Sequence, residues 1–252
     1  MELFPSSATK DKDARMHLIL PPYIPLIMGG AFVIASAIAS YAFYSVHALD
    51  NVLSVTGSAK KEVTADTVKW TIDITRKVGE TNMQSGYPLL AQDLGAIQDF
   101  LKQNNVPDSA VTISQVFTEQ QYNNNGPVEY NLRQEVTVNS KDVEGLNALA
   151  KNISALSAKG IFISNNQLEF YISNLPELRV SLLADAIKDA KARATELAKA
   201  GGQSIGVLRS ASSGVVQVLP PNSVDVSDYG QYDTQSIQKE VMVTARASFS
   251  VR

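Results

Sequence analysis

The stretch from Asp185 to Ser210 reads DAIKDAKARATELAKAGGQSIGVLRS and joins a long helix to a strand. Apolar residues recur at helical spacing from about Leu178 to Lys199, and charged residues occupy the opposite face. Gly201-Gly202 predicts the end of this helix, because glycine is the usual residue just beyond a helix. A strand is predicted from Ile205 to Ser210, so the stretch indicates a fold in which helices alternate with strands.

Strands with one buried face lie on both sides of this unit. From Thr67 to Arg76, apolar residues alternate with polar ones, and the same alternation runs from Val241 to Val251. A period of two is typical of antiparallel strands with one face buried and one in water. We therefore predict an α+β fold in which antiparallel strands pack with helices on one side.

Local signals place the remaining elements. Asp142 is a candidate N-cap of a helix that Gly160 closes, and Pro88 should start or kink an earlier helix. The Asn125-Gly126 step predicts a hairpin. The predicted segments are strand Asn51 to Ser58, a helix within Asn82 to Gln103, strands Val111 to Gln121 and Glu129 to Asn139, and strand Gln167 to Ser173.

The N-terminal region contains a long apolar segment. No Asp, Glu, Lys or Arg occurs from Met16 to Leu49, and the core from Tyr23 to Val46 is long enough to cross a bilayer as a helix. A signal peptide cleaved near Val46-His47-Ala48 and a buried core helix are the alternatives. The first of these would have an unusually long apolar region, and the second rarely lacks charge over so long a run.

Basic residues predict the orientation of this helix. Lys10, Lys12 and Arg15 precede it, whereas the first basic residues after it are Lys60 and Lys61. The excess before the helix favours a cytoplasmic N-terminus. We predict a short cytoplasmic segment (residues 1–20), a transmembrane helix (21–48) and one extracytoplasmic domain (49–252), held in the inner membrane with the domain in the periplasm or outside the cell.

The composition excludes several kinds of site. The chain has no cysteine, and its two histidines, His17 and His47, flank the apolar segment, so the domain has no thiolate or imidazole chemistry. A net charge of −3 gives no support to nucleic-acid binding. We therefore expect no nucleic-acid partner, and these residues indicate no particular small-molecule ligand.

Carboxylates are the remaining candidates for chemistry. Asp185 with Asp189, and Asp225 with Asp228, could act as pairs only if they met in a cleft. The segment from Asp225 to Asp233 offers oxygen ligands for calcium but lacks the EF-hand spacing, so a flexible acidic loop is expected. We predict no catalytic, cofactor-binding or metal-binding residues, no cofactor, and a protein that is not an enzyme.

Three segments resemble the SIMPL domain family of exported and outer-membrane-antigen-like bacterial proteins. They are the opening strand Leu53-Ser-Val-Thr-Gly-Ser-Ala59, the alanine-rich helix and strand from Asp185 to Ser210, and the closing strand from Glu240 to Val251. Ala59 stands where the family usually has a second glycine, and Ala65-Asp66-Thr67 replaces the common P-D-x-A. The resemblance implies an α+β fold, export, large homo-oligomeric rings in some members and a role in envelope stress tolerance. It implies no enzymatic residues.

Three functions remain open at this stage. The first is a membrane-tethered protein that self-assembles into a ring or cage, through the exposed face of the long helix and the strand Val241 to Val251, provided that this strand lies at a sheet edge rather than inside the sheet. The second is an envelope-binding or chaperone-like module that acts as a monomer or dimer. The third, a hydrolase that uses carboxylates or serines, has the least support because the domain has no histidine.

Overall fold

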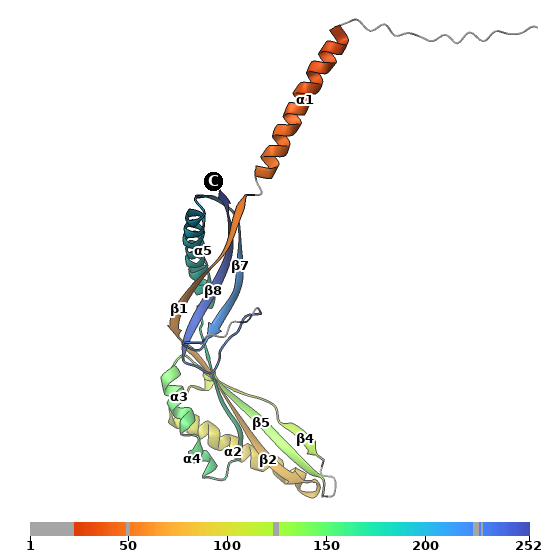
Figure 1. The fold of residues 1–252 in the computed structure, drawn as a ribbon. Helices are drawn as coiled ribbons and strands as arrows, with labels where there is room; N and C mark the ends of the chain where they lie inside the picture. The colour runs from red at the N-terminus through yellow and green to blue at the C-terminus, as the bar shows by residue number, and fades with distance from the viewer. Residues whose placement is uncertain (1–22, 49–50, 123–125, 224–226, 228) are drawn as a thin grey trace, which may run out of the picture. The chain divides into compact units, whose positions relative to one another are not determined.

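This computed structural model describes residues 23–48, 51–122, 126–223, 227 and 229–252 (Figure 1). The chain divides into two compact units, residues 1–51 and 52–252. In the first unit, helix α1 spans Tyr23–Ala48. Its segment Leu26–Ser45 is long and apolar enough to cross a membrane, and none of it is buried. These features fit a membrane anchor and also fit a signal sequence.

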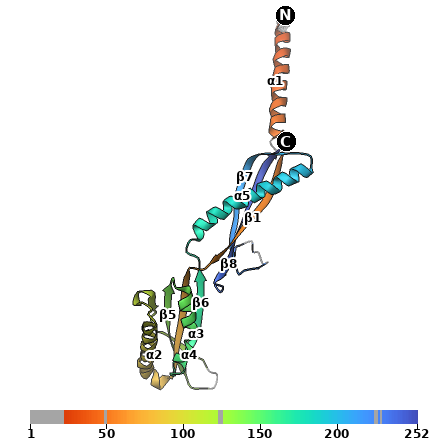
Figure 2. The same cartoon turned by 90° about the vertical axis from the view of Figure 1, so that its left-hand side faces the viewer.

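The second unit contains two antiparallel sheets. The first, which we call sheet A, has the strand order β1-β8-β7 and consists of β1 (Val52–Thr64), β7 (Ile205–Leu219) and β8 (Gln238–Val251). Strand β1 pairs with β8 without interruption from Val52↔Ser250 to Thr64↔Gln238. Helix α5 (Leu175–Ala200) lies along sheet A, chiefly over β1 and β8, as Figures 1 and 2 show.

Small residues let α5 lie close to sheet A. Ala186, Ala190, Ala194 and Ala198 recur every fourth residue and are all buried, so they form one face of the helix. A Cβ atom added to Gly57 of β1 would come closer than 3.0 Å to the backbone of Ala186 and Ala190. Helix and strand therefore meet backbone to backbone, and glycine is required at position 57 for steric reasons.

The second sheet, sheet B, comes from the middle of the chain. Its strands follow the order β3-β5-β2-β6, and β4 also pairs with β5. Its strands and helices are β2 (Thr67–Gly79), α2 (Met83–Gln103), β3 (Val111–Ile113), β4 (Phe117–Gln121), β5 (Glu129–Ser140), α3 (Val143–Lys151), α4 (Ser154–Ser157) and β6 (Ile163–Tyr171), with 3-10 turns at Glu80–Asn82 and Asp108–Ala110.

The core of sheet B is built from large side chains. The alternating residues of β2 predicted to be buried are fully buried. They pack against apolar residues of α2 and α3, and Trp70 Nε1 donates a hydrogen bond to Asn166 Oδ1 (2.7 Å). The residues of this core include Val68, Trp70, Ile72, Ile74, Leu90, Ile97, Leu101, Leu146 and Leu156.

Several predicted features are confirmed. The α+β class is confirmed, and the side chain of Asp142 caps α3 by accepting the Gly145 N–H (2.9 Å). Strands β4 and β5 are adjacent and antiparallel, as the predicted hairpin requires, although Asn125 itself lies outside the described residues. Helix α5 ends at Ala200, and the positive φ of Gly202 (71°) fits its role after the helix.

Other boundaries differ from the prediction. Strand β7 continues to Leu219 instead of ending near Ser210, because pairing with β8 imposes extended structure on a serine- and glycine-rich segment of weak propensity. The strand predicted over Val111 to Gln121 is broken into β3 and β4, since the hydroxyl of Ser114 accepts the Glu135 N–H that a backbone carbonyl would otherwise take (2.9 Å).

Two helix predictions also need correction. Of the two roles predicted for Pro88, starting the helix is wrong, because α2 begins at Met83 and Pro88 lies inside it. The helix expected between Asp142 and Gly160 is broken between α3 and α4, an arrangement in which both Ile153 and Leu156 are buried in the core of sheet B.

The closing strand does not lie at a sheet edge. Strand β8 pairs with β1 on one side and with β7 on the other, so the proposed contact through an exposed edge at Val241 to Val251 is wrong. The reason is that β1 and β7 each satisfy one row of its backbone hydrogen-bonding groups. The edges of sheet A are β1 and β7.

Candidate functional site

The chain passes between sheet A and sheet B through two short connections. Asp66, in one connection, is hydrogen-bonded to the other. The chain passes from β1 to β2 through Ala65-Asp66, and from β6 to α5 through Ile172-Ser173-Asn174. The carboxylate of Asp66 accepts hydrogen bonds from the Ser173 N–H (2.9 Å) and the Ser173 hydroxyl (2.7 Å). Burial alone would raise the pKa of Asp66, but these hydrogen bonds lower it.

A segment that follows β7, residues 229–239, bridges the two sheets, and we call it the strap. On the side of sheet A, the Val218 N–H donates to the carbonyl of Gln231 and the Asp233 N–H donates to the carbonyl of Val218 (2.8 Å each). On the side of sheet B, the Phe170 N–H donates to the carbonyl of Thr234 (2.8 Å). The strap therefore ties both sheets through backbone hydrogen bonds.

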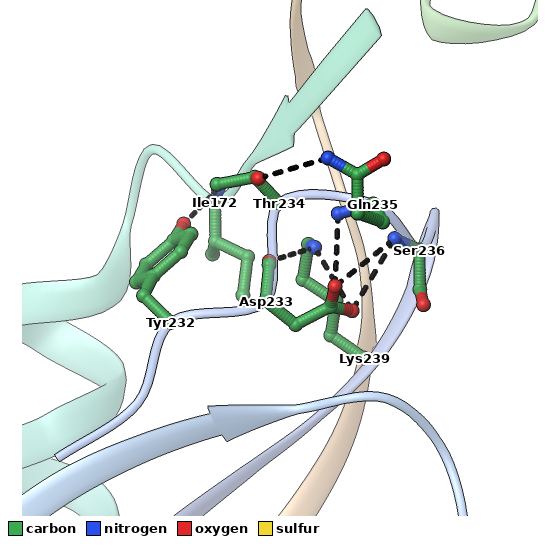
Figure 3. A network of polar contacts seen from close by, with 7 residues as sticks. All are labelled: Ile172, Tyr232, Asp233, Thr234, Gln235, Ser236 and Lys239. Carbon is green, nitrogen blue, oxygen red and sulfur yellow. Dashed lines mark hydrogen bonds and ion pairs between the residues drawn. The ribbon is translucent and has the colours of Figure 1, made fainter.

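A fully buried lysine lies within the strap. Lys239 has 0% of its surface exposed, and its Nζ donates to the backbone carbonyl of Asp233 and lies 3.6 Å from the Asp233 carboxylate. The ammonium is also 5.9 Å from the ring centre of Tyr232, whose hydroxyl accepts the Ile172 N–H (3.0 Å; Figure 3). The charge is thus compensated by a carboxylate, a carbonyl and an aromatic ring.

Burial and charge perturb both members of this pair. Burial lowers the pKa of Lys239, and the Asp233 carboxylate opposes that change. Burial would raise the pKa of Asp233, but hydrogen bonds from the N–H groups of Gln235 and Ser236, together with Lys239, lower it overall. The carboxylate therefore stays ionised at neutral pH, and the pair has the features of a structural ion pair.

A cleft of about 580 Å³ lies beside sheet B, between the loop that follows α2 and the start of α3. Asn104, Asn105, Asn139 and Asn152 supply amide groups at its surface, and Lys141 and Asp142 supply charge, while Leu146 and Leu149 are among its apolar lining residues. This volume is in the range of small-molecule sites. Lys239 and Asp233 do not line it.

The two edges of sheet A differ in charge and cover. Strand β1 carries Lys60, Lys61 and Glu62 in succession, and Asp189 of α5 accepts the Ser58 N–H (2.8 Å). Charged side chains and occupied donors are ways in which proteins protect sheet edges from pairing. Strand β7 carries one charged residue, Arg209, and every residue from Val207 to Ser213 is exposed.

The comparisons with known proteins give a family. A family model described as "SIMPL: Protein of unknown function (DUF541)" matches residues 53–251. The chain belongs to the SIMPL family. No curated protein matches it. The match covers both sheets and excludes α1.

The SIMPL match and the structure together explain the opening strand. At Gly57 the backbone of α5 leaves no room for a Cβ atom, so this glycine has a steric role. Ala59, where a second glycine is usual, packs partly buried against the cluster that contains Leu178 and Leu182. The SIMPL fold of this chain accommodates the alanine methyl group there.

Only one of the two predicted carboxylate pairs lies within the described residues. Asp185 forms an ion pair with Lys188 (2.9 Å), and Asp189 accepts the Ser58 N–H and pairs with Arg193 (2.8 Å). The Ser58 N–H and then Arg193 lower the pKa of Asp189. Asp225 and Asp228 lie outside the described residues, and within the described part of the chain no group of three or more acidic or histidine side chains could hold a metal ion.

Sequence reasoning missed the three polar residues that tie the sheets together. In the sequence, Asp66 stands within a departure from the family motif, Asp233 stands within a segment expected to be a flexible acidic loop, and nothing distinguishes Lys239. A lysine directly before a strand of alternating apolar residues gives no signal of burial, because lysine is normally exposed. The partners of all three residues lie far away in the sequence or across a loop.

Proposed function

We propose that this SIMPL protein is a non-enzymatic cell-envelope protein that is anchored in the inner membrane and self-assembles into a large homo-oligomer, a ring or cage. Residues Tyr23 to Val46 act as the anchor, and the domain lies in the periplasm or outside the cell. In this proposal the assembly contributes to envelope stress tolerance, the role associated with the family that the sequence resembles.

The observation that carries the proposal is the uncovered strand β7. Its exposed segment Val207–Ser213 includes Val207, 57% exposed, and Leu208, 47% exposed. Isolated apolar residues on a surface are common, but an uncovered edge strand also presents unpaired backbone groups to another chain. Tethering the chains in one bilayer raises their effective concentration, which strengthens a weak contact of this kind.

A structural role also agrees with the ionisable groups of the domain. The carboxylates with lowered pKa values, Asp66, Asp189 and Asp233, each accept hydrogen bonds within the fold. None of the three lines the cleft beside sheet B. Active sites usually bring perturbed groups together in a cleft, and this arrangement favours a scaffold over an enzyme.

The cleft favours a second candidate, a periplasmic binding or chaperone-like module that acts as a monomer or dimer. Its amide groups could hydrogen-bond a polar ligand above the apolar residues Leu146 and Leu149. This candidate needs no large assembly, so the mass of the particle separates the two functions.

The test is the mass of the detergent-extracted full-length protein by light scattering, beside a chain that starts at Asp50. The shorter chain retains all the cores of the second unit, residues 52–252. We expect a large, defined oligomer from the full-length protein, and its survival in the shorter chain would place the contacts in the domain. A monomer or dimer from both chains would overturn the ring or cage and leave the binding module.

A further inference from the structure

The cleft beside sheet B is formed by three segments that are separate in the sequence. The loop after α2 contributes residues 104–107 and 110, the end of β5 and the turn after it contribute residues 139–142, and α3 contributes one of its faces. Leu146 and Leu149 of that face belong to the core of sheet B. The apolar part of the lining is therefore held in place by the packing of the fold.

Asparagine side chains from all three segments meet at this cleft. They are exposed, and they belong to Asn104, Asn105, Asn139 and Asn152. Asn104 Nδ2 donates to the backbone carbonyl of Phe100 (2.8 Å). The side chains of Asn105, Asn139 and Asn152 make no hydrogen bond within the described chain. Three amide groups can thus each donate to a ligand and accept from it.

The two charged groups of the cleft differ in their partners. The Asp142 carboxylate accepts the Gly145 N–H (2.9 Å) and so caps α3. Lys141 forms no ion pair with any residue that the structure describes, so its ammonium favours a ligand carboxylate. The N-terminus of α3 is already capped and carries Glu144 in its first turn, an arrangement that does not favour a phosphate group.

The lining disfavours two further classes of ligand. Among the described residues that line the cleft there is no phenylalanine, tyrosine or tryptophan. Nucleobases usually stack on aromatic side chains in their binding sites, and sugar rings commonly pack on aromatic rings as well. The apolar contacts offered here are aliphatic, which suits an aliphatic side chain better than a flat ring.

The groups of the cleft match the backbone of a peptide. A peptide backbone carries the same amide group as asparagine, so it can exchange hydrogen bonds with the free asparagine side chains in both directions. An extended peptide also points alternate side chains to opposite faces, so one of them can meet Leu146 and Leu149 while the next points to water. Peptide-binding sites combine main-chain hydrogen bonds with side-chain pockets in this way.

We propose that this cleft binds a short extended peptide that has an aliphatic side chain and a carboxylate. The three free asparagine amides hydrogen-bond its backbone, its aliphatic side chain packs against Leu146 and Leu149, and its carboxylate lies near Lys141. This site goes beyond the self-assembly proposed above and does not depend on it. It gives the second candidate function a class of ligand.

The first test compares three probes on the detergent-extracted full-length protein, with detergent alone as the blank. The probes are acetyl-Leu-Ala-Leu with a free carboxylate, the same peptide with a carboxamide end, and the same peptide with N-methylated backbone amides. Saturation-transfer difference NMR detects weak binding even to a large oligomer. We expect the free acid to bind best and the N-methylated peptide to lose binding, because it cannot donate hydrogen bonds. Equal binding of the N-methylated peptide would overturn the backbone contact.

A pair of asparagine variants places the peptide in the cleft. Asn139→Ala removes one free amide, and we expect the affinity for acetyl-Leu-Ala-Leu to fall by about two- to tenfold. Asn165→Ala is the matched control, because Asn165 lies on β6 of the same sheet and does not line the cleft. Circular dichroism checks that both variants are folded. Equal affinities of the two variants would overturn the assignment to this cleft.

A pair of lysine variants tests the place of the carboxylate. Lys141→Gln should abolish the preference of the protein for the free acid over the carboxamide peptide, since the ammonium that favours the acid is gone. Lys77→Gln is the matched control, because Lys77 is an exposed lysine of β2 that does not line the cleft. A Lys141→Gln protein that keeps the natural preference would overturn the role of Lys141.

These outcomes are separate from the mass of the particle. A large oligomer that binds none of the peptides would overturn this inference and leave the self-assembly standing. A monomer that binds acetyl-Leu-Ala-Leu through Asn139 and Lys141 would support the inference and overturn the ring or cage. A cleft that binds a disaccharide of N-acetylglucosamine and none of the peptides would overturn the peptide as its ligand.

Discussion

The two sheets of this SIMPL domain hold their helices in different ways. Sheet A meets α5 through Gly57 and a row of buried alanines, so helix and strand approach backbone to backbone. Sheet B meets α2 and α3 through Trp70 and large aliphatic side chains. The distance between helix and sheet is set by backbone contact at sheet A. At sheet B it is set by the volume of the side chains between them.

The difference predicts opposite sensitivities to mutation. At sheet A a methyl group added at Gly57 cannot be accommodated by a side-chain movement, because the atoms it meets belong to the backbone of α5. At sheet B the interior already accommodates side chains of several shapes, and removing an atom leaves a small cavity. The strap between the sheets adds a third case, in which charge rather than shape matters.

The largest effect is expected at the strap, which couples the two regions. Asp233→Ala removes the carboxylate beside the buried Lys239, and we expect the free energy of unfolding to fall by about 3–5 kcal/mol, since an uncompensated buried charge remains. Chemical denaturation followed by circular dichroism measures it. The double variant Asp233→Ala/Lys239→Met should recover much of the loss, and an unimproved double variant would show that the ion pair is not the cause.

The Asp233–Lys239 pair also predicts that the stability of the fold depends on pH. The pKa of Asp233 is lowered in the folded state, so its contribution to stability is present above the unfolded pKa, about 3.9, and is lost as the pH falls through the lower folded value. Thermal unfolding of the natural protein and of Asp233→Asn from pH 6 downward should therefore converge under acid conditions. Curves that stay parallel would contradict this assignment.

A smaller effect is expected where α5 meets β1. Gly57→Ala should lower the free energy of unfolding by about 2–3 kcal/mol, because the new methyl group overlaps the backbone of Ala186 and Ala190. Gly79→Ala is the matched control in sheet B, where an added Cβ meets nothing within 4 Å. Urea unfolding of both variants tests the comparison. Equal small losses would mean that α5 can move away from sheet A at little cost.

The smallest effect is expected in the core of sheet B. Ile72→Val removes one buried methyl group from beside Trp70, and we expect a loss of about 1 kcal/mol in the free energy of unfolding. Urea midpoints measured beside Gly57→Ala give the ranking. A loss larger than that of Gly57→Ala would reverse the contrast between the two sheets.

Much of the local structure could be predicted from the residues. The alternation from Val68 to Ile74 identified the buried face of β2, and the four-residue spacing of alanines belongs to the helix that the sequence indicated. The full length of β7 could not be predicted, since Ser210 to Gly214 has weak propensity for a strand. Its extended structure comes from pairing with β8, far away in the sequence.

The candidate site also combines features that the sequence predicts with features that only folding creates. The sequence excluded cysteine and histidine chemistry, because a chain cannot use residues that it lacks. It gave no sign that Lys239 is buried or that Asp66 joins two connections, since both depend on partners brought together by folding.

The sequence by itself determined the apolar N-terminal segment, the α+β class, the main helices and the family resemblance, because these depend on periodicity and composition within short windows. Only the tertiary structure decided that the strands form two sheets, that β8 is central and that β7 is an open edge. Strand order depends on which backbone groups meet over long separations, and a local pattern of side chains carries no record of that choice.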